Sequence, residues 1–265
     1  MMMKKLDINK TAPKISIVTI CFNSVKFIER TIQSVLLQTY PNIEYIIIDG
    51  GSTDGTKEII EKYSSKISYW CSEKDNGIYD AMNKGIKIAT GEWINFMNSG
   101  DSFVSENVLA NVMSASIGDD ICVVYCDAIY DCGNYEEKSI CKDLEGITYK
   151  MVFCHQSCLI RTSIQKERPF SLKYKIAGDY DFFYNLYFEK GERVFKHLPI
   201  FFAKDDMTDS LSRKFYFAAL RENLKISAAH KDLRWYRDKL RFVIKDLIGW
   251  EKNRNLYKRI LIFWR

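Results

Sequence analysis

The sequence predicts an α/β fold in which helices flank a mostly parallel central sheet. Short β-branched apolar runs alternate with segments whose apolar residues recur at helical spacing. Turns rich in glycine and polar residues separate the two kinds of segment. The chain has 265 residues, 47% of them hydrophobic, which is enough to bury a large core. We therefore expect one large α/β domain and a small additional element.

The first strand and helix are predicted near the amino end of the chain. Residues 14–22 form a β-branched run suited to a buried parallel strand, and Asn23 follows it as a natural helix N-cap. Apolar residues then recur at helical spacing over residues 28–36. Pro41 ends this helix, because proline cannot continue the helical hydrogen bonding.

The same alternation continues to about residue 126. Beyond that point the periodicity is weak, and turn signals at 131–134 and 145–146 divide a less regular middle region. The predicted strands are 43–48, 67–70, 93–97 and 121–126, and the predicted helices are 59–63, 78–89 and 104–116.

The eight cysteines indicate reduced thiols. The sequence contains no Cys-x-x-Cys pair, and its first residues lack the apolar core of a signal peptide, so we expect a cytoplasmic protein. Cys154 and Cys158 flank His155, but the sequence offers no fourth zinc ligand at usable spacing. We therefore interpret these two thiols as small buried hydrophobic groups.

Two acidic turns follow predicted strands, at the edge where open α/β sheets bind nucleotides. Asp49 precedes two glycines that let a ligand approach the backbone, and its carboxylate can accept an N–H of a base such as uracil. An equally weighted alternative is that Asp49 and Asp54 cap the turn and the next helix. Asp101 offers hard oxygen ligands for Mg²⁺ or Mn²⁺ beside a diphosphate, and its alternative role is a helix cap.

A third acidic segment begins a predicted amphipathic helix. Asp179 and Asp181 precede a run of apolar and aromatic residues, so one or both lie in the first helical turn. One of them can act as a general base that takes a proton from an attacking hydroxyl. The alternative is a favourable interaction with the helix dipole alone.

Four segments match, in order and spacing, the motifs of a known enzyme family. They are Ile15–Asn23, Ile48–Thr56, Asn76–Gly85 and Gly91–Ile94. On these segments, roughly residues 14–210 resemble the family 2 glycosyltransferases, with their GT-A nucleotide-sugar-binding fold. Four ordered motifs are far more specific than any one of them.

The resemblance implies a chemistry and a set of site residues. Asp101 would hold a divalent cation, Mn²⁺ or Mg²⁺, and Asp179 matches the acid that serves as catalytic base in family members. Members act by inversion: an acceptor hydroxyl attacks the anomeric carbon opposite the departing nucleoside diphosphate. The residues implied to contact the nucleotide are Thr19, Cys21, Asn23, Asp49, Asp75, Lys84 and Asn98.

The sequence departs from the family pattern at two acidic motifs. Many relatives carry Asp-x-Asp-Asp where this chain has Asn98-Ser99-Gly100-Asp101, which is similar to the variant in relatives that build bacterial surface polysaccharides. Asn98 can still hydrogen-bond a ribose, and Asp101 can still ligate a metal. The usual glutamate before the base is Gly178 here, so the nearest acid to the base is Asp181.

Further polar residues are candidates for the same region. The resemblance supports an interpretation in which His155 and Gln156 face the acceptor or the diphosphate, although a lone histidine is more often a structural hydrogen-bonding residue. Asp181 is a third candidate there. Asp205 and Asp206 lie where relatives have a flexible active-site loop, and we expect them to be solvated charges.

A basic tail over residues 213–265 follows the predicted catalytic domain over 1–212. It carries 15 Lys and Arg against 5 Asp and Glu, a net charge of +10, whereas the whole chain carries +5. A helical wheel over 233–247 shows an apolar stripe beside four cations, with aromatic residues off the stripe.

We expect this tail to bind an anionic membrane surface. The alternative is packing on the catalytic domain or on a second copy in a homodimer. The sequence has no stretch near the ~20 apolar residues needed to span a membrane. Nucleic acid is not expected as a partner, because the tail is the one basic region.

Taken together, these features predict an inverting glycosyltransferase that is cytoplasmic and peripheral on the inner face of the cell membrane. It would move a hexose or N-acetylhexosamine from a UDP-linked donor to a lipid-linked saccharide acceptor in polysaccharide biosynthesis. One alternative is a sugar nucleotidyltransferase, which is disfavoured because residues 21–24 offer no glycine-rich phosphate loop. The other is a catalytically silent scaffold subunit, which the reduced acidic motif would suit.

Overall fold

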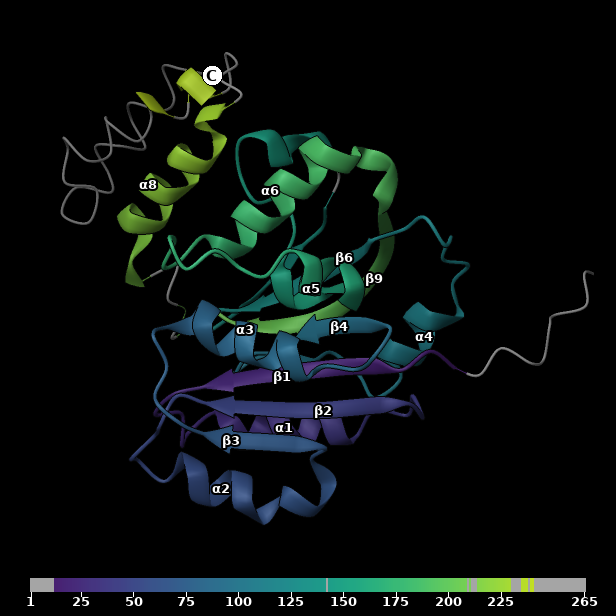
Figure 1. Ribbon diagram of the computed structural model, residues 1–265, viewed down its shortest axis with the longest axis vertical. Coiled ribbons are helices and arrows are strands. Elements are labelled where there is room, and N and C mark those ends of the chain that lie inside the picture. Colours follow the sequence, from purple (N-terminus) through teal and green to yellow (C-terminus); the bar gives the residue numbers. More distant parts are fainter. Residues whose placement is uncertain are drawn as a thin grey trace, which may run out of the picture.

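A mixed β-sheet forms the centre of the molecule, and helices cover both of its faces (Figure 1). The computed structural model describes residues 12–141, 143–208, 210, 214–229, 235–237 and 239–240. Among these residues, nine strands pair in the order β3-β2-β1-β4-β8-β6-β9-β5, with β7 on β6. The α/β fold class predicted from the sequence is confirmed.

The strands are β1 Ile15–Cys21, β2 Ile43–Asp49, β3 Tyr69–Ser72, β4 Trp93–Phe96, β5 Ser102–Phe103, β6 Val123–Asp131, β7 Glu136–Ser139, β8 Cys158–Arg161 and β9 Phe195–Asp206. The α-helices are α1 Ile28–Leu36, α2 Thr56–Lys62, α3 Ile78–Ile88, α4 Val108–Ser114, α5 Thr162–Glu167, α6 Gly178–Lys190 and α8 Tyr216–Ile226. The 3₁₀ turns are η1 Ser64–Lys66, η2 Leu144–Thr148, η3 His155–Ser157, η4 Glu192–Val194 and η5 Ser227–Ala229.

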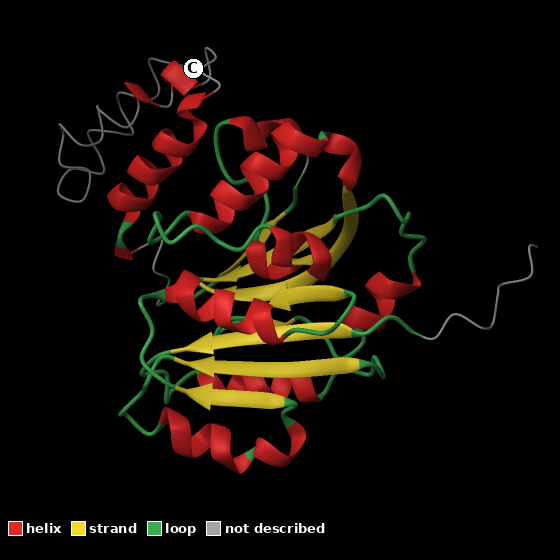
Figure 2. Ribbon diagram, in the orientation of Figure 1, coloured by secondary structure: helices red, strands yellow, loops and turns green. Residues whose placement is uncertain are grey.

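Four neighbouring strands, β3, β2, β1 and β4, run parallel, so their carboxyl ends meet at one edge (Figure 2). Their apolar, β-branched sequences suit strands that are covered on both faces. The second half of the sheet is different: β8 runs antiparallel to both β4 and β6, and a long parallel ladder joins β6 to β9. This half comes from the region where the sequence periodicity is weak.

Two local predictions were wrong, and both errors come from contacts between distant residues. Asn23 does not cap a helix: its φ is 48°, and α1 begins five residues later. The Asn23 side chain instead accepts the N–H of Thr53 at 3.1 Å, which ties the end of β1 to the turn after β2. The helix predicted from residue 104 begins at Val108, because Ser102 and Phe103 pair with β9.

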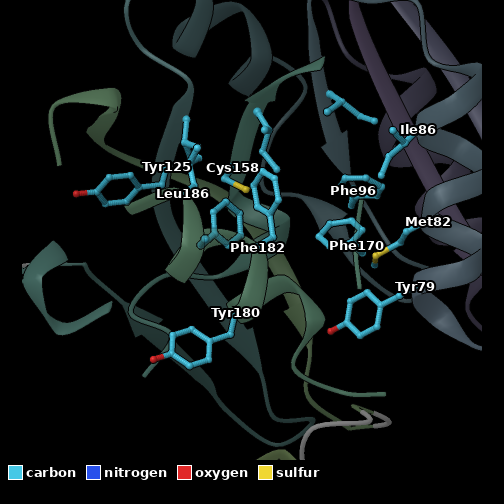
Figure 3. Close-up of a cluster of buried hydrophobic side chains, with 14 of the residues drawn as sticks. Tyr79, Met82, Ile86, Phe96, Tyr125, Cys158, Phe170, Tyr180, Phe182 and Leu186 are labelled. Atoms are coloured by element: carbon cyan, nitrogen blue, oxygen red, sulfur yellow. The ribbon is translucent and has the colours of Figure 1, made fainter. Parts of the chain in front are cut away.

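Hydrophobic cores lie on both faces of the sheet. One contains side chains of α1 and α4, and the other packs α3 and α6 against the sheet. Figure 3 shows part of the second core, in which Tyr79 and Met82 from α3 lie near Phe96 of β4 and Phe170. The ring of Phe170 packs against those of Tyr79 and Phe96, with centroids 5.4 Å apart in each pair, so the second core forms the floor beneath the candidate site.

The described part of the basic tail packs on the main body. Helix α8 contacts α6, and Ile226, at the end of α8, is buried in the same core as α6. Trp235 is also buried, and its indole N–H donates to the carbonyl of Leu224 at 3.2 Å. Most of the stripe predicted over 233–247 lies outside the described residues, and the domain boundary at 213 stays a prediction. Across the part of the chain that the structure describes, no helix is both long and apolar enough to cross a membrane.

Candidate active site

The candidate site lies at the edge where the parallel strands end, and hydrogen bonds between turns shape it. The N–H of Gly50 donates to the carbonyl of Cys21, and the N–H of Ser99 donates to that of Ile20. The turns after β1, β2 and β4 are therefore fixed to one another. This is the edge at which the sequence predicted the nucleotide.

Asp49 organises the turn after β2. Its carboxylate is completely buried and accepts the N–H of Ser52 at 2.9 Å and the hydroxyl of Ser72 at 2.6 Å. The thiol of Cys21 lies 3.4 Å from the same carboxylate, and burial, with Asp49 beside it, raises the pKa of Cys21. Asp54 accepts the N–H of Thr56 at 3.0 Å, at the start of α2. These contacts are those of the capping alternative for Asp49 and Asp54.

The other residues implied to contact the nucleotide spread around this edge. Thr19 is completely buried inside the sheet, where its hydroxyl donates to the carbonyl of Met97 at 2.8 Å. Lys84 forms an ion pair with Glu73 at 2.8 Å. Thr19 therefore links β1 to the residue that follows β4. Lys84 lies on α3, beside the loop after β3.

Asp75 and the exposed ring of Phe22 lie over the turn that Asp49 organises. Asp75 is half-buried, and a Cβ added at Gly50 would lie 2.5 Å from its carboxylate oxygen, so glycine lets this side chain approach the turn closely. Phe22 follows β1 with 61% of its surface exposed, and its ring also borders Gly50. Sequence reasoning missed Phe22, although its aromatic side chain directly follows the first strand.

Asp101 is buried at the same edge, and each carboxylate oxygen has a partner. One oxygen accepts the N–H of Asp206 and the other accepts the side-chain amide of Gln156, both at 2.9 Å. The carboxyl of Asp205 adjoins it. Burial, and then the negative charge of Asp205, raises the pKa of Asp101 well above its ordinary value. Burial likewise raises the pKa of Asp205.

The expectation that Asp205 is a solvated charge was wrong. The β6–β9 ladder continues to Asp206, so β9 places Asp205 against a carboxyl that is more than 100 positions earlier in the chain. Two adjacent buried carboxylates repel each other unless a proton or a cation lies between them. Local sequence carries no signal for this pair.

The pair fits a hard divalent cation. Carboxylate oxygens are the ligands that Mg²⁺ and Mn²⁺ prefer, and one or two of them suffice when substrate phosphates complete the coordination. Within the described ranges, no group of three or more His, Cys, Asp or Glu side chains is arranged to hold a metal. Asp101 and Asp205 therefore suit a cation shared with a diphosphate better than a closed protein site.

Asp179 lies in the first turn of α6, as predicted. One carboxylate oxygen lies 2.9 Å from the hydroxyl of Tyr79, and the other lies 4.0 Å from Nδ1 of His155. A Cβ added at Gly178 would lie 2.9 Å from the Tyr79 ring. The glycine that replaces the family's usual glutamate therefore leaves the space that Tyr79 occupies.

His155 is a buried, neutral side chain beside that carboxylate. Its ring packs 5.2 Å from the ring of Phe96, and burial lowers the pKa of His155 although the charge of Asp179 opposes this. Its Nε2 has no hydrogen-bond partner among the described residues, and the same holds for Oδ1 of Asn98 and Oγ of Ser99. Three further buried atoms, on Asn95, Thr162 and Gln165, also lack a partner among the described residues, and the three at this edge are candidate contacts for a ligand.

The turn η3 lies between Asp101 and Asp179, whereas Asp181 has a partner on its own helix. Gln156 bonds Asp101, and the preceding residue, His155, faces Asp179, so the turn η3 connects the two carboxylates. Asp181 instead accepts the side-chain amide of Asn185 at 3.1 Å on α6. A carboxylate pair for a cation, a separate carboxylate for a proton and unpartnered polar atoms are the components of a group-transfer site.

The family model for glycosyl transferase family 2 matches residues 16–191. The chain therefore belongs to the family 2 glycosyltransferases, and it is a glycosyltransferase. Among curated proteins, it is 28% identical over 262 residues to a PGL/p-HBAD biosynthesis glycosyltransferase of Mycobacterium bovis, covering 96% of this chain and 98% of the relative. An uncharacterized glycosyltransferase of Mycobacterium tuberculosis is 41% identical over 109 residues, 41% of this chain and 42% of the relative.

Solved structures show the same GT-A fold. TarS of S. aureus, in complex with UDP, superposes with a TM-score of 0.64 at 21% identity, covering 91% of this chain and 73% of that one. Glucosyl-3-phosphoglycerate synthase of Mycobacterium tuberculosis, in complex with Mn²⁺, UDP and glucosyl-3-phosphoglycerate, superposes with a TM-score of 0.58 at 14% identity, covering 83% and 82%.

The buried pair predicts how stability depends on pH. Because the pKa of Asp101 and that of Asp205 are raised in the folded protein, folding retains protons that the unfolded chain releases above about pH 4. Without divalent cations, the free energy of unfolding should therefore fall as pH rises from about 4 through the raised pKa values. Asp205→Asn should lessen this loss and raise the Tm at pH 8 by at least about 2 °C, or roughly 1 kcal/mol.

Thermal unfolding from pH 5 to pH 8, with and without Mn²⁺, tests this prediction. Mn²⁺ should stabilise the native sequence at pH 8 more than it stabilises Asp205→Asn. Asp119→Asn is a matched control, because that carboxylate is exposed. Equal pH slopes for the native sequence and Asp205→Asn would contradict the proposed pair.

Proposed function

We propose that this protein is an inverting glycosyltransferase that moves a hexose or N-acetylhexosamine from a UDP-linked donor to a saccharide acceptor. The observation that carries the proposal is the turn η3, whose consecutive residues His155 and Gln156 contact Asp179 and Asp101. A proton-accepting carboxylate and a cation-binding carboxylate are thereby held on one side of the sheet edge. Inverting transfer needs both groups.

The donor lies over the turns after β1, β2 and β4. The exposed ring of Phe22 can stack on a planar base, and Oδ1 of Asn98, which has no partner among the described residues, can accept a hydrogen bond from a ribose hydroxyl. Asp75 lies beside Phe22 and offers a further acceptor. The structurally similar TarS binds UDP and UDP-GlcNAc, which supports a uridine nucleotide.

The diphosphate lies next to Asp101 and Asp205, which would hold Mn²⁺ or Mg²⁺ together with Gln156. When bound, the cation supplies positive charge that stabilises the leaving diphosphate. Two structurally similar enzymes were solved with Mn²⁺, which supports this requirement. Gln156 orients Asp101 by donating to one of its oxygens.

Asp179 takes the proton of the acceptor hydroxyl. The hydroxyl oxygen attacks the anomeric carbon, the bond from that carbon to the diphosphate breaks, and the diphosphate leaves with the electron pair. Attack opposite the leaving group inverts the anomeric centre, so an α-linked donor gives a β linkage. The hydroxyl of Tyr79 holds the carboxylate of Asp179 in place. Burial lowers the pKa of His155, so its imidazole is neutral and does not form an ion pair with Asp179.

The acceptor is assigned to a cavity of about 370 Å³ whose lining includes residues 149–153, directly before the turn η3 in the chain. Phe153, two residues before His155, lines it, together with the aromatic side chains of Tyr130 and Tyr149. Burial raises the pKa of Tyr130, so this phenol stays neutral in the cavity wall. Ser139, Asp143 and Lys150 share the lining with these aromatic rings, and such a mixture of polar and aromatic side chains suits a saccharide acceptor.

We expect the cavity to govern acceptor binding. Tyr149→Ala should raise the KM for the acceptor by about tenfold and leave the KM for UDP-sugar unchanged, because the side chain lines only the acceptor cavity. Initial rates with both substrates varied measure this. An increase confined to the KM for UDP-sugar would show that the acceptor does not bind in this cavity.

Asp179→Asn should abolish transfer, with a loss of about 10²-fold to 10⁴-fold in kcat, because the amide cannot accept the proton. UDP binding in the presence of Mn²⁺, measured by calorimetry, should change less than twofold. Asp181→Asn is the matched control on the same helix turn and should remain active. Full turnover by Asp179→Asn would show that another residue is the general base.

The same calorimetry separates the two alternatives that the sequence left open. A silent scaffold subunit should bind no UDP in a metal-dependent manner, whereas a transferase should bind it. A sugar nucleotidyltransferase should form a nucleotide sugar from a sugar phosphate and UTP instead of consuming one. The family assignment and the Asp179 site support the transferase.

We further propose that the protein binds the inner face of the cell membrane through its basic tail, close to a lipid-linked acceptor. Tyr236 and Leu240 expose 57% and 45% of their surfaces near Arg237 and Lys239, which suits an anionic headgroup layer. Co-sedimentation with vesicles containing phosphatidylglycerol should be strong and should fall several-fold in Tyr236→Ser/Leu240→Ser. Equal sedimentation with neutral vesicles, or loss of a homodimer in the double variant, would indicate protein packing instead.

A further inference from the structure

A carboxylate from α8 binds the backbone directly before α6. The oxygens of Glu222 accept three consecutive N–H groups, from Lys175 at 3.0 Å and from Ile176 and Ala177 at 2.9 Å. Charge-assisted hydrogen bonds of this kind are roughly twice as strong as neutral ones. Glu222 therefore fixes the segment that leads into the turn carrying Asp179.

The peptide group between Ile176 and Ala177 connects Glu222 to Tyr79. Its N–H donates to Glu222, and its carbonyl accepts the hydroxyl of Tyr79 at 2.7 Å. The same hydroxyl lies 2.9 Å from Asp179. One peptide group thus links the α8 carboxylate to the hydroxyl that contacts the base.

This arrangement suits a carboxylate that must accept a proton. The hydroxyl of Tyr79 has one proton and two acceptors, the carbonyl of Ile176 and the carboxylate of Asp179. Once Asp179 has received a proton, its O–H can donate to the Tyr79 oxygen while the Tyr79 proton turns to the carbonyl. A negative charge on the N–H side of the peptide polarises that carbonyl and makes it a better acceptor.

We infer that Glu222 and Tyr79 are positioning residues for Asp179, and that α8 therefore contributes to the active site. The inference rests on the proposed role of Asp179 as base. Anchors other than Glu222 hold α8 in place, because α8 packs on α6 and Ile226 is buried in the same core. Loss of the Glu222 charge should therefore leave α8 on the body.

Kinetics of Glu222→Gln in the full chain test this inference. The amide keeps the size of the side chain but replaces one of the two acceptor oxygens by a donor. We expect kcat for sugar transfer to fall about tenfold, with the donor KM and the Kd for UDP within twofold of the native values. Glu222→Asp keeps both oxygens and should recover part of the lost kcat.

Two further variants separate positioning from general stability. Tyr79→Phe should lower kcat as Glu222→Gln does, and the double variant should lose no more than the worse single variant, because both act through one peptide group. Ile226→Ala loosens α8 without touching that peptide, so it should lower the Tm but leave kcat within twofold at a temperature well below the Tm.

Native kcat in Glu222→Gln, multiplying losses in the double variant, or a loss in Ile226→Ala equal to that in Glu222→Gln would each reject the inference. If Asp179→Asn is inactive while Glu222→Gln and Tyr79→Phe turn over normally, this inference alone fails. If Asp179→Asn is active, the proposed role of Asp179 as base fails.

Discussion

The turn η3 sets the spacing between the two acidic parts of the site. Asp101 follows β4 and Asp179 begins α6, and these elements are far apart in the sequence. Gln156 bonds the first carboxylate, and the residue before it, His155, contacts the second. Because consecutive residues of one short turn lie against both groups, a displacement of η3 would change the surroundings of both carboxylates.

Buried polar contacts fix the position of η3 itself. Asn95 interrupts the apolar sequence of β4 and is completely buried, and its amide donates to the carbonyls of Gln156 and Cys158 at 2.9 and 2.8 Å. The hydroxyl of Ser157 accepts the N–H of Ala203 from β9 at 3.2 Å. A buried amide costs stability unless it is hydrogen-bonded, so the two bonds from the Asn95 nitrogen offset part of that cost, while its Oδ1 has no partner among the described residues. Together with the Ser157 contact they fix η3 between β4 and β9.

Sequence reasoning predicted the features that depend on neighbouring residues. The parallel strands and the first turn of α6, with Asp179, follow from apolar spacing and turn chemistry within short windows. Asp205 was misjudged, because its partner Asp101 reaches it only through the sheet order. Tyr79 and Glu222 were also missed, since each looks like an ordinary helix residue until it is placed beside the segment before α6.

The crowding of Tyr79 against Gly178 links two positions that lie far apart in the chain. A β-carbon at residue 178 would lie 2.9 Å from the Tyr79 ring, so the backbone before the base and the ring cannot both keep their present places if position 178 carries a side chain. Family members with glutamate there should accordingly bear a small residue at the position equivalent to 79. The two sites would then vary as a pair in evolution, and exchanging either one alone between such enzymes should be harmful.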